Sequence, residues 1–377
     1  VMMGPNNYLG RSYMATPIAI TVEGANILTR SLIIYGQGAI RCHPFVLREL
    51  QAAGDEDYDR GLIEFDDALF GHIGYAISNM ARSFFLALTH AKFSQVPLNT
   101  PTRRYYQNIN RYSAAFALAS DFAMLTLGGD LKRRELLSAR LGDILSSMYL
   151  ASCVLKHFEN EGRRATDLPL VEWSVRTLMY QAQESLHEFL LNIPNRWVSW
   201  FLRFFIFPRG RTYKNPSDEL GQKIVALMTT PGESRERLSK YAYTTLEPGN
   251  AFGKLQEALE LSKENAPLEK RLRQASKEGL IESDYIGLQI DEAEKAQVIS
   301  KAEANSLRDY HEKVAALLDV DDFAPGEFVG GSASTAAGAP PRKAPKEPAA
   351  KKAARKKKPA ARKASSKKAS KKKTTKA

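Results

Sequence analysis

Helical periodicity dominates this chain and most constrains its fold. Apolar residues recur every three or four positions from about residue 24 to about residue 318, as in the series Ile73, Ile77, Met80, Phe84 and Leu88. No segment shows sustained alternation of apolar and polar residues, which is typical of a half-buried strand. The sequence therefore predicts an all-α protein.

Turn residues divide the periodic region into separate helices. Residues 1–17, rich in Gly, Asn and Pro, are expected to form a loop. A helix over about 24–42 is expected to pack closely through a face that contains Ser31, Ile34 and Cys42, with Cys42 and Cys153 as buried thiols. Further helices are expected at about 104–127, 131–160, 170–192, 217–229, 233–243 and 251–263, and from Asp291 to about residue 318.

Charge is distributed unevenly along the chain. The formal net charge is +12, but residues 331–377 alone hold 17 Lys and Arg and one acid, Glu347, so the remainder has a net charge of −4. From Pro325 onward Gly, Ser, Ala, Pro and Lys dominate. Such a composition buries too little apolar surface to offset the entropy of ordering, so residues 326–377 are predicted to be a disordered basic tail.

Glu23 is a lone carboxylate in a run of apolar and small residues, and Gly24 follows it directly. An apolar setting raises the pKa of a carboxyl toward the range useful for a general base. Glycine lets the backbone turn sharply and lets another group approach. The alternative is an ordinary helix N-terminus, with Glu23 placed favourably in the first turn.

Three segments, residues 4–11, 20–26 and 36–44, resemble the acyl-CoA dehydrogenase family, in its long bacterial branch for fatty-acid β-oxidation. The pair Glu23-Gly24 resembles the family's catalytic Glu-Gly motif. The resemblance implies three parts: the end of the catalytic helical domain (1–44), an additional C-terminal helical domain (45–325) and the tail (326–377). It begins near the end of the catalytic core, so we expect the C-terminal part of an enzyme, inactive alone.

The resemblance also implies chemistry. Glu23 would remove the α-proton of an acyl-CoA, hydride would pass from the β-carbon to FAD, and trans-2-enoyl-CoA would form. Gly24 and Asn26 would contact the flavin, although Ala25-Asn26 replaces the commoner Thr-Ser. An electron-transfer flavoprotein would accept the electrons. A homo-oligomer in the bacterial cytoplasm, associated with the inner membrane, is the expected setting.

A non-catalytic interaction module is the alternative function. The segment from Trp197 to Phe207 is rich in aromatic residues and flanked by arginines, which suits a membrane interface, a buried core helix or a subunit contact. The basic tail suits polyanion binding without sequence readout, or simple solubilisation. No metal site is predicted, because the six histidines lack zinc-ligand spacing.

Overall fold

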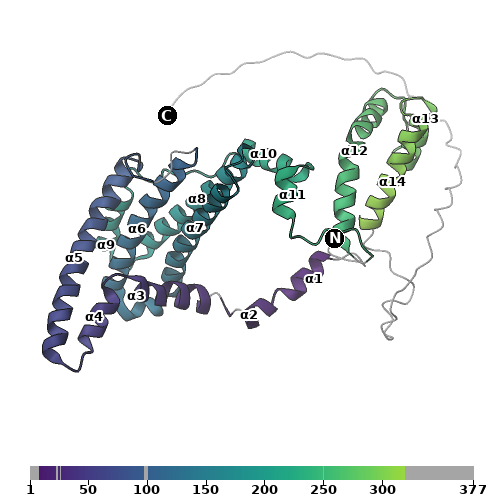
Figure 1. Cartoon of the computed structure of the whole chain (residues 1–377). Coiled ribbons are helices and arrows are strands. Elements are labelled where there is room, and N and C mark those ends of the chain that lie inside the picture. Colours follow the sequence, from purple (N-terminus) through teal and green to yellow (C-terminus); the bar gives the residue numbers. More distant parts are fainter. Residues whose placement is uncertain (1–7, 23, 26, 97–100, 249, 319–377) are drawn as a thin grey trace, which may run out of the picture. The chain divides into compact units, whose positions relative to one another are not determined.

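The computed structural model describes residues 8–22, 24–25, 27–96, 101–248 and 250–318, and the description below concerns these residues. Every regular element among them is helical (Figure 1), which confirms the all-α prediction. The tail predicted at residues 326–377 lies outside the described residues, as do Glu23 and Asn26.

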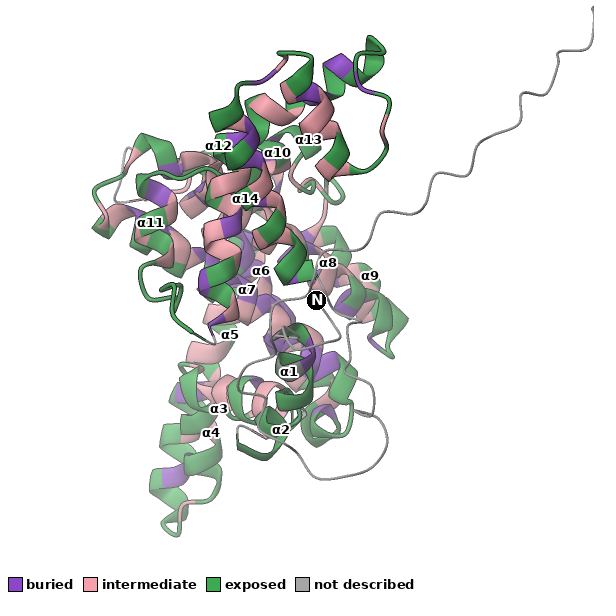
Figure 2. Ribbon diagram, turned by 90° about the vertical axis from the view of Figure 1, so that its right-hand side faces the viewer, coloured by how far each residue is buried: buried purple, intermediate pink, exposed green. Residues whose placement is uncertain are grey.

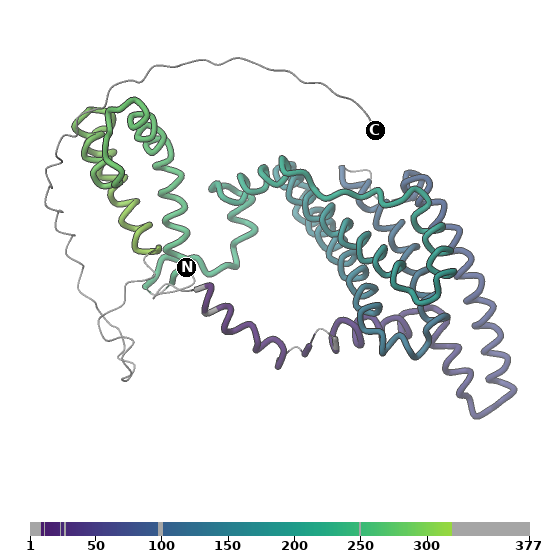
Figure 3. The backbone as a smooth tube through the Cα atoms, turned by 180° about the vertical axis from the view of Figure 1, so that it is seen from behind, coloured from purple at the N-terminus to yellow at the C-terminus, as the bar shows by residue number. Residues whose placement is uncertain are grey.

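A bundle of long helices forms the largest packed region. Helix α5 (Tyr58–Leu88) packs against α4 (Val46–Ala53) and α6 (Arg103–Leu127), and α7 (Glu135–Asn160) packs against α8 (Leu168–Asn192). The shorter α9 (Arg196–Ile206) contacts α5 and α8. Figures 1 and 3 show these helices side by side from opposite directions.

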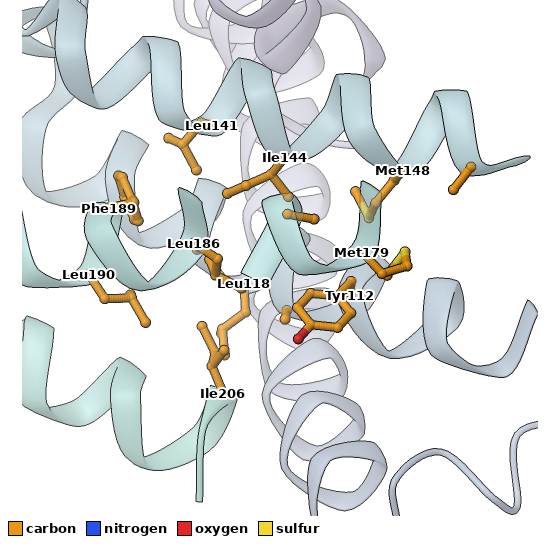
Figure 4. Close-up of a cluster of buried hydrophobic side chains, with 14 of the residues drawn as sticks. Tyr112, Leu118, Leu141, Ile144, Met148, Met179, Leu186, Phe189, Leu190 and Ile206 are labelled. Atoms are coloured by element: carbon orange, nitrogen blue, oxygen red, sulfur yellow. The ribbon is translucent and has the colours of Figure 1, made fainter. Parts of the chain in front are cut away.

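The core of the bundle lies between α6, α7, α8 and α9. Leu118, Leu141, Leu186 and Phe189 come from three of these helices and are fully buried, and Figure 4 shows them converging. Burying each such side chain contributes roughly 1.5–3 kcal/mol relative to leaving it exposed. By length and composition, the segment Arg103–Lys132 is the one stretch of the described residues able to cross a membrane. Its helix α6 supplies ten buried residues here and serves as a core helix.

Side-chain caps fix where several helices begin. The Asp57 carboxylate accepts a hydrogen bond from the Arg60 amide at the start of α5. The Asn195 side chain accepts from the amides of Trp197 and Val198 at the start of α9. Each cap satisfies backbone donors that have no partner within the helix, a contribution of about 1 kcal/mol.

The N-terminal part differs from its prediction. Residues 8–15, expected as loop, form α1 (Tyr8–Ala15), followed by α2 (Ile18–Val22), whose residues are exposed (Figure 2). The expected helix over 24–42 is a π-helix, η1 (Ile27–Gln37), continued by α3 (Gly38–Cys42). Its wider winding buries Ser31 and Tyr35, whereas Ile34 is exposed. The buried-thiol prediction is wrong, since Cys42 and Cys153 are both exposed.

The last helices form a packed group with a core of its own. After α10 (Asp218–Thr229) and α11 (Glu233–Ser239), helices α12 (Ala251–Lys277), α13 (Ile286–Lys295) and α14 (Lys301–Leu318) bury Leu272, Ile290 and Leu307 together. The single helix predicted from Asp291 onward is wrong. The chain breaks at Gln297, where φ is 57°, and Arg308 of α14 pairs with Asp291 and Glu294 of α13.

Candidate functional site

The helical path breaks where the sequence places the Glu-Gly pair. Helix α2 ends at Val22 and η1 begins at Ile27, and between them Gly24 has φ +82°, a conformation that strains other residues. A Cβ at Gly24 would lie 3.3 Å from Thr29 Oγ1. The amides of Leu28 and Thr29 both donate to the Ala25 carbonyl. Glu23 and Asn26 lie outside the described residues, so only their neighbours Gly24 and Ala25 are placed.

Close packing against α7 fixes the position of η1. Arg30 Nη1 donates to Asp143 Oδ1 over 3.0 Å. At the neighbouring Gly142, a Cβ would lie 3.2 Å from Arg30 Cγ and 3.3 Å from the Arg30 carbonyl oxygen. Gly142 therefore lets the backbone of η1 approach α7, and Tyr35 reaches the bundle core beyond it. The segment after Gly24 is thus fixed to the bundle.

A cavity of about 390 Å³ lies beside η1, and the exposed residues Ile34 and Cys42 are part of its lining. Its wall is largely apolar, formed by Ile34, Phe116, Met124, Leu145 and Met148. Among the lining residues, Asp121 Oδ2 is buried without a hydrogen-bond partner within the described residues, and the buried hydroxyls of Tyr35 and Ser120 are neighbours. Burial raises the pKa of Tyr35 well above its ordinary value, so its hydroxyl stays neutral and can donate.

A largely buried hydrogen-bond network, in which His72 and Glu49 keep partial exposure, connects this cavity to α4 and α5. His43 Nε2 lies 3.0 Å from Asp121 Oδ1, and His43 Nδ1 accepts from the amides of Phe45 and Val46. His72 Nδ1 lies 2.8 Å from Glu49 Oε1, and its Nε2 lies 3.9 Å from Asp121 Oδ1. This network could not be predicted from the sequence, because its residues come from separate segments without ligand spacing.

The same residues give the strongest metal candidate among the described residues, since ligand atoms of His43, His72 and Asp121 lie within 4.8 Å of one another. The hydrogen bonds argue against metal binding. Because His43 Nδ1 accepts two backbone N–H groups, the ring proton resides on Nε2, where it is donated to Asp121. A protonated nitrogen cannot ligate a metal. The cluster is a structural hydrogen-bond network.

Helix α9 has two unlike faces. Leu202 and Ile206 lie in the core, whereas Trp197, Trp200 and Phe204 are 83%, 67% and 51% exposed. Arg196 and Arg203 are also exposed on this helix, and neither forms an ion pair within the part of the chain that the structure describes. We call Arg196, Trp197, Trp200, Arg203 and Phe204 the aromatic face of α9. Of the three contexts considered for this segment, a fully buried core helix is excluded.

Comparison with known proteins identifies the family to which the chain belongs. Residues 40–323 match the family model described as "Acyl-CoA dehydrogenase, C-terminal, bacterial type". The match spans α4 to α14 together with the end of α3. No solved structure matches the chain.

Proposed function

Because the chain belongs to the bacterial-type acyl-CoA dehydrogenase C-terminal family, we propose that it forms the C-terminal part of an FAD-dependent enzyme oxidising acyl-CoA to trans-2-enoyl-CoA. This is the first step of fatty-acid β-oxidation. The family match over residues 40–323 carries the proposal. The left-handed turn at Gly24, directly after Glu23, supports it.

In this proposal Glu23 is the base that removes the α-proton of the thioester substrate. The proton is weakly acidic, so the negative charge that develops on the thioester oxygen needs hydrogen-bond donors. The resemblance assigns one donor to the backbone N–H of Glu23 itself. Its neighbours Val22 and Ala25 are uncharged but exposed to solvent, so the bound substrate and flavin would have to exclude water to raise the pKa of the Glu23 carboxyl toward that of an effective base.

Gly24 and Asn26 would hold the flavin at this site. The described residues fit such a contact at Gly24, because a side chain there would be strained by the positive φ and would crowd Thr29. Ala25 offers no side-chain hydrogen bond, and Asn26 would supply the donor in its place. When bound, FAD would take up the hydride that leaves the substrate β-carbon. An electron-transfer flavoprotein would then reoxidise it.

The test uses the intact, flavin-loaded protein without oxygen. Adding acyl-CoA should bleach the flavin absorption within seconds. Glu23→Gln should abolish the bleaching, because the amide cannot accept the proton at a useful rate. Glu56→Gln is the matched control, since Glu56 is exposed in the connection between α4 and α5. Bleaching at an unchanged rate in Glu23→Gln would mean that another residue is the base.

The aromatic face of α9 supports a second role, peripheral contact with the inner membrane of a bacterial cell. Trp and Arg are suited to the headgroup region, where an apolar ring and a cation can both be accommodated. The exposed Trp197 and Trp200 carry this proposal. The basic tail at residues 326–377 would add electrostatic attraction to polyanions, including anionic lipid. A homo-oligomer is expected from the resemblance.

A further inference from the structure

A cationic groove of about 490 Å³ lies where the turn after α5 meets α6, α8 and the segment after α9. Five cations line it, against one acid, Glu172: Lys92, Arg104, Arg111, Arg176 and Lys214. The acid is already paired, because Glu172 Oε1 lies 3.0 Å from Arg176 Nη1. The other four cations have no carboxylate partner in the lining, so the groove has an excess of positive charge.

Arg111 is the most informative of these cations. Arg111 is only 3% exposed, although it lines the groove. Arg111 Nη1 donates to Thr212 Oγ1 over 3.0 Å, and the guanidinium lies 5.4 Å from the Tyr112 ring centroid. It forms no ion pair with a carboxylate of the described residues. A buried guanidinium without a counter-charge is costly, and a bound anion would remove that cost.

Hydrogen bonds hold the groove walls in place. His90 and Ala91 have φ of 51° and 57°, a strained conformation for residues with side chains. Arg104 Nη2 fixes this turn by donating to the His90 carbonyl over 2.8 Å, and Gln107 Nε2 donates to the Lys92 carbonyl over 3.0 Å. The turn is therefore prearranged rather than assembled around a ligand.

The opposite wall is fixed in the same way. Gln183, fully buried on α8, accepts from the Tyr213 amide at 2.8 Å and donates to the Tyr213 carbonyl at 3.1 Å. The Tyr213 hydroxyl is buried without a hydrogen-bond partner among the described residues.

The positive charge of the groove also affects His90, which lines it. Burial, followed by the charges of Arg111, Arg209, Lys92 and Arg104, lowers the pKa of His90 below its ordinary value.

We propose that this groove binds a phosphate or diphosphate group of a soluble small molecule, with Arg111 as its charged floor and Lys92 and Lys214 at its rim. Several cations match the three or more oxygens of a phosphoryl group better than the two of a carboxylate. The site is independent of the chemistry proposed for Glu23 and requires neither flavin nor acyl-CoA.

The test follows His90 directly, because the basic tail also attracts anions and would obscure a bulk binding signal. The full chain is labelled with ¹³C at the histidine rings, and His90→Gln identifies the His90 resonance. Titration with inorganic pyrophosphate should move that resonance saturably and raise the His90 pKa, because an adjacent anion stabilises the imidazolium. The proposal would be overturned if saturating pyrophosphate left the His90 resonance unchanged and vesicles of phosphatidylglycerol left it unchanged as well.

Charge-removal variants locate the binding. The double variant Lys92→Gln/Lys214→Gln should weaken pyrophosphate binding by at least about tenfold. The control Lys263→Gln/Lys277→Gln removes the same charge from exposed positions on α12 and should leave the affinity unchanged. Arg111→Met should abolish the His90 response, with circular dichroism confirming retained helix. Equal affinity in the groove and control variants would contradict the site.

A second titration identifies the source of the phosphate. Vesicles of phosphatidylglycerol replace pyrophosphate, and vesicles of phosphatidylcholine serve as the neutral comparison. A response to pyrophosphate that these vesicles do not reproduce supports a soluble ligand. An Arg111-dependent response to phosphatidylglycerol alone would keep the phosphate chemistry but overturn the soluble source, because the ligand would then be a lipid headgroup.

Discussion

His43 donates from Nε2 to Asp121 Oδ1 over 3.0 Å while its Nδ1 accepts the backbone amides of Phe45 and Val46. One ring therefore caps the start of α4 and fixes it to α6. The side chains of His43 and Asp121 are only 8% and 6% exposed, so the pair has little access to water. This hydrogen bond couples the end of the segment that contains Glu23 and Gly24 to the bundle.

We predict that Asp121→Ala lowers the free energy of unfolding by about 2–3 kcal/mol, because it leaves the buried His43 N–H without an acceptor. The matched control is Asp143→Ala, which breaks another 3.0 Å pair, with Arg30, whose two side chains are 37% and 39% exposed. The control should cost less than about 1 kcal/mol. Urea unfolding followed by circular dichroism measures both. Equal losses in the free energy of unfolding would mean that the His43–Asp121 hydrogen bond contributes no more to stability than the more exposed Arg30–Asp143 pair.

Two glycine substitutions should have opposite effects on stability. Gly142→Ala places a Cβ 3.2 Å from Arg30 Cγ, forcing η1 away from α7, and should cost about 1–3 kcal/mol. A Cβ added at Gly74, on the exposed side of α5, would meet no atom within 4 Å. Gly74→Ala should therefore stabilise the folded chain by about 0.5–1 kcal/mol, because alanine has the higher helix propensity. Thermal unfolding of both variants tests the prediction, which fails if both move in the same direction.

Acid should loosen the packing of α12 and α14 through His311. Burial, opposed in part by Glu269, lowers the His311 pKa below its ordinary value of 6.5 in the folded chain. The unfolded state then binds the proton more tightly, so stability is lost as pH falls through about 6.5. Amide hydrogen exchange in these helices should quicken between about pH 7.5 and 5.5, after correction for the intrinsic rate. His311→Gln should flatten this dependence, and an equally steep profile would refute the assignment.

Exposed tryptophans make membrane contact measurable. We predict that phosphatidylglycerol vesicles carrying a quencher in the upper acyl chain reduce the fluorescence of Trp197 and Trp200. Replacing both with serine should weaken vesicle binding by at least about tenfold, since two large aromatic areas no longer enter the interface. The third tryptophan, Trp173, serves as the internal control in that variant. Vesicle binding that is unchanged without Trp197 and Trp200 would assign any attachment to the tail.

The positions of most helices were predictable from periodicity, because turn and cap residues sit where helices start and stop. Gly128 follows α6, and Pro194 lies between α8 and α9. The π-helical winding of η1 could not be predicted from the sequence. A spacing of three and four residues suggested Ile34 as a buried position, but the π-helix turns more slowly and buries Tyr35 instead. The break at Gln297 was also missed, because no glycine or proline marks it.

The candidate site was only partly predictable. The Glu23-Gly24 pair is adjacent in sequence, so a local motif could identify it, and the structure adds the left-handed turn at Gly24. The His43–Asp121 pair and the Arg111–Thr212 bond join residues 78 and 101 positions apart. Such contacts depend on how helices pack, and no spacing in the sequence encodes them.

The proposed function depends above all on whether Glu23 removes the α-proton. The intact flavin-loaded protein is incubated with acyl-CoA deuterated at the α-carbon, and release of deuterium to water is measured for the wild type, Glu23→Gln and Glu56→Gln. We predict normal release in the wild type and Glu56→Gln, and a rate about 10²–10⁴-fold lower in Glu23→Gln. Release at the wild-type rate from Glu23→Gln would contradict the assignment of Glu23 as the base.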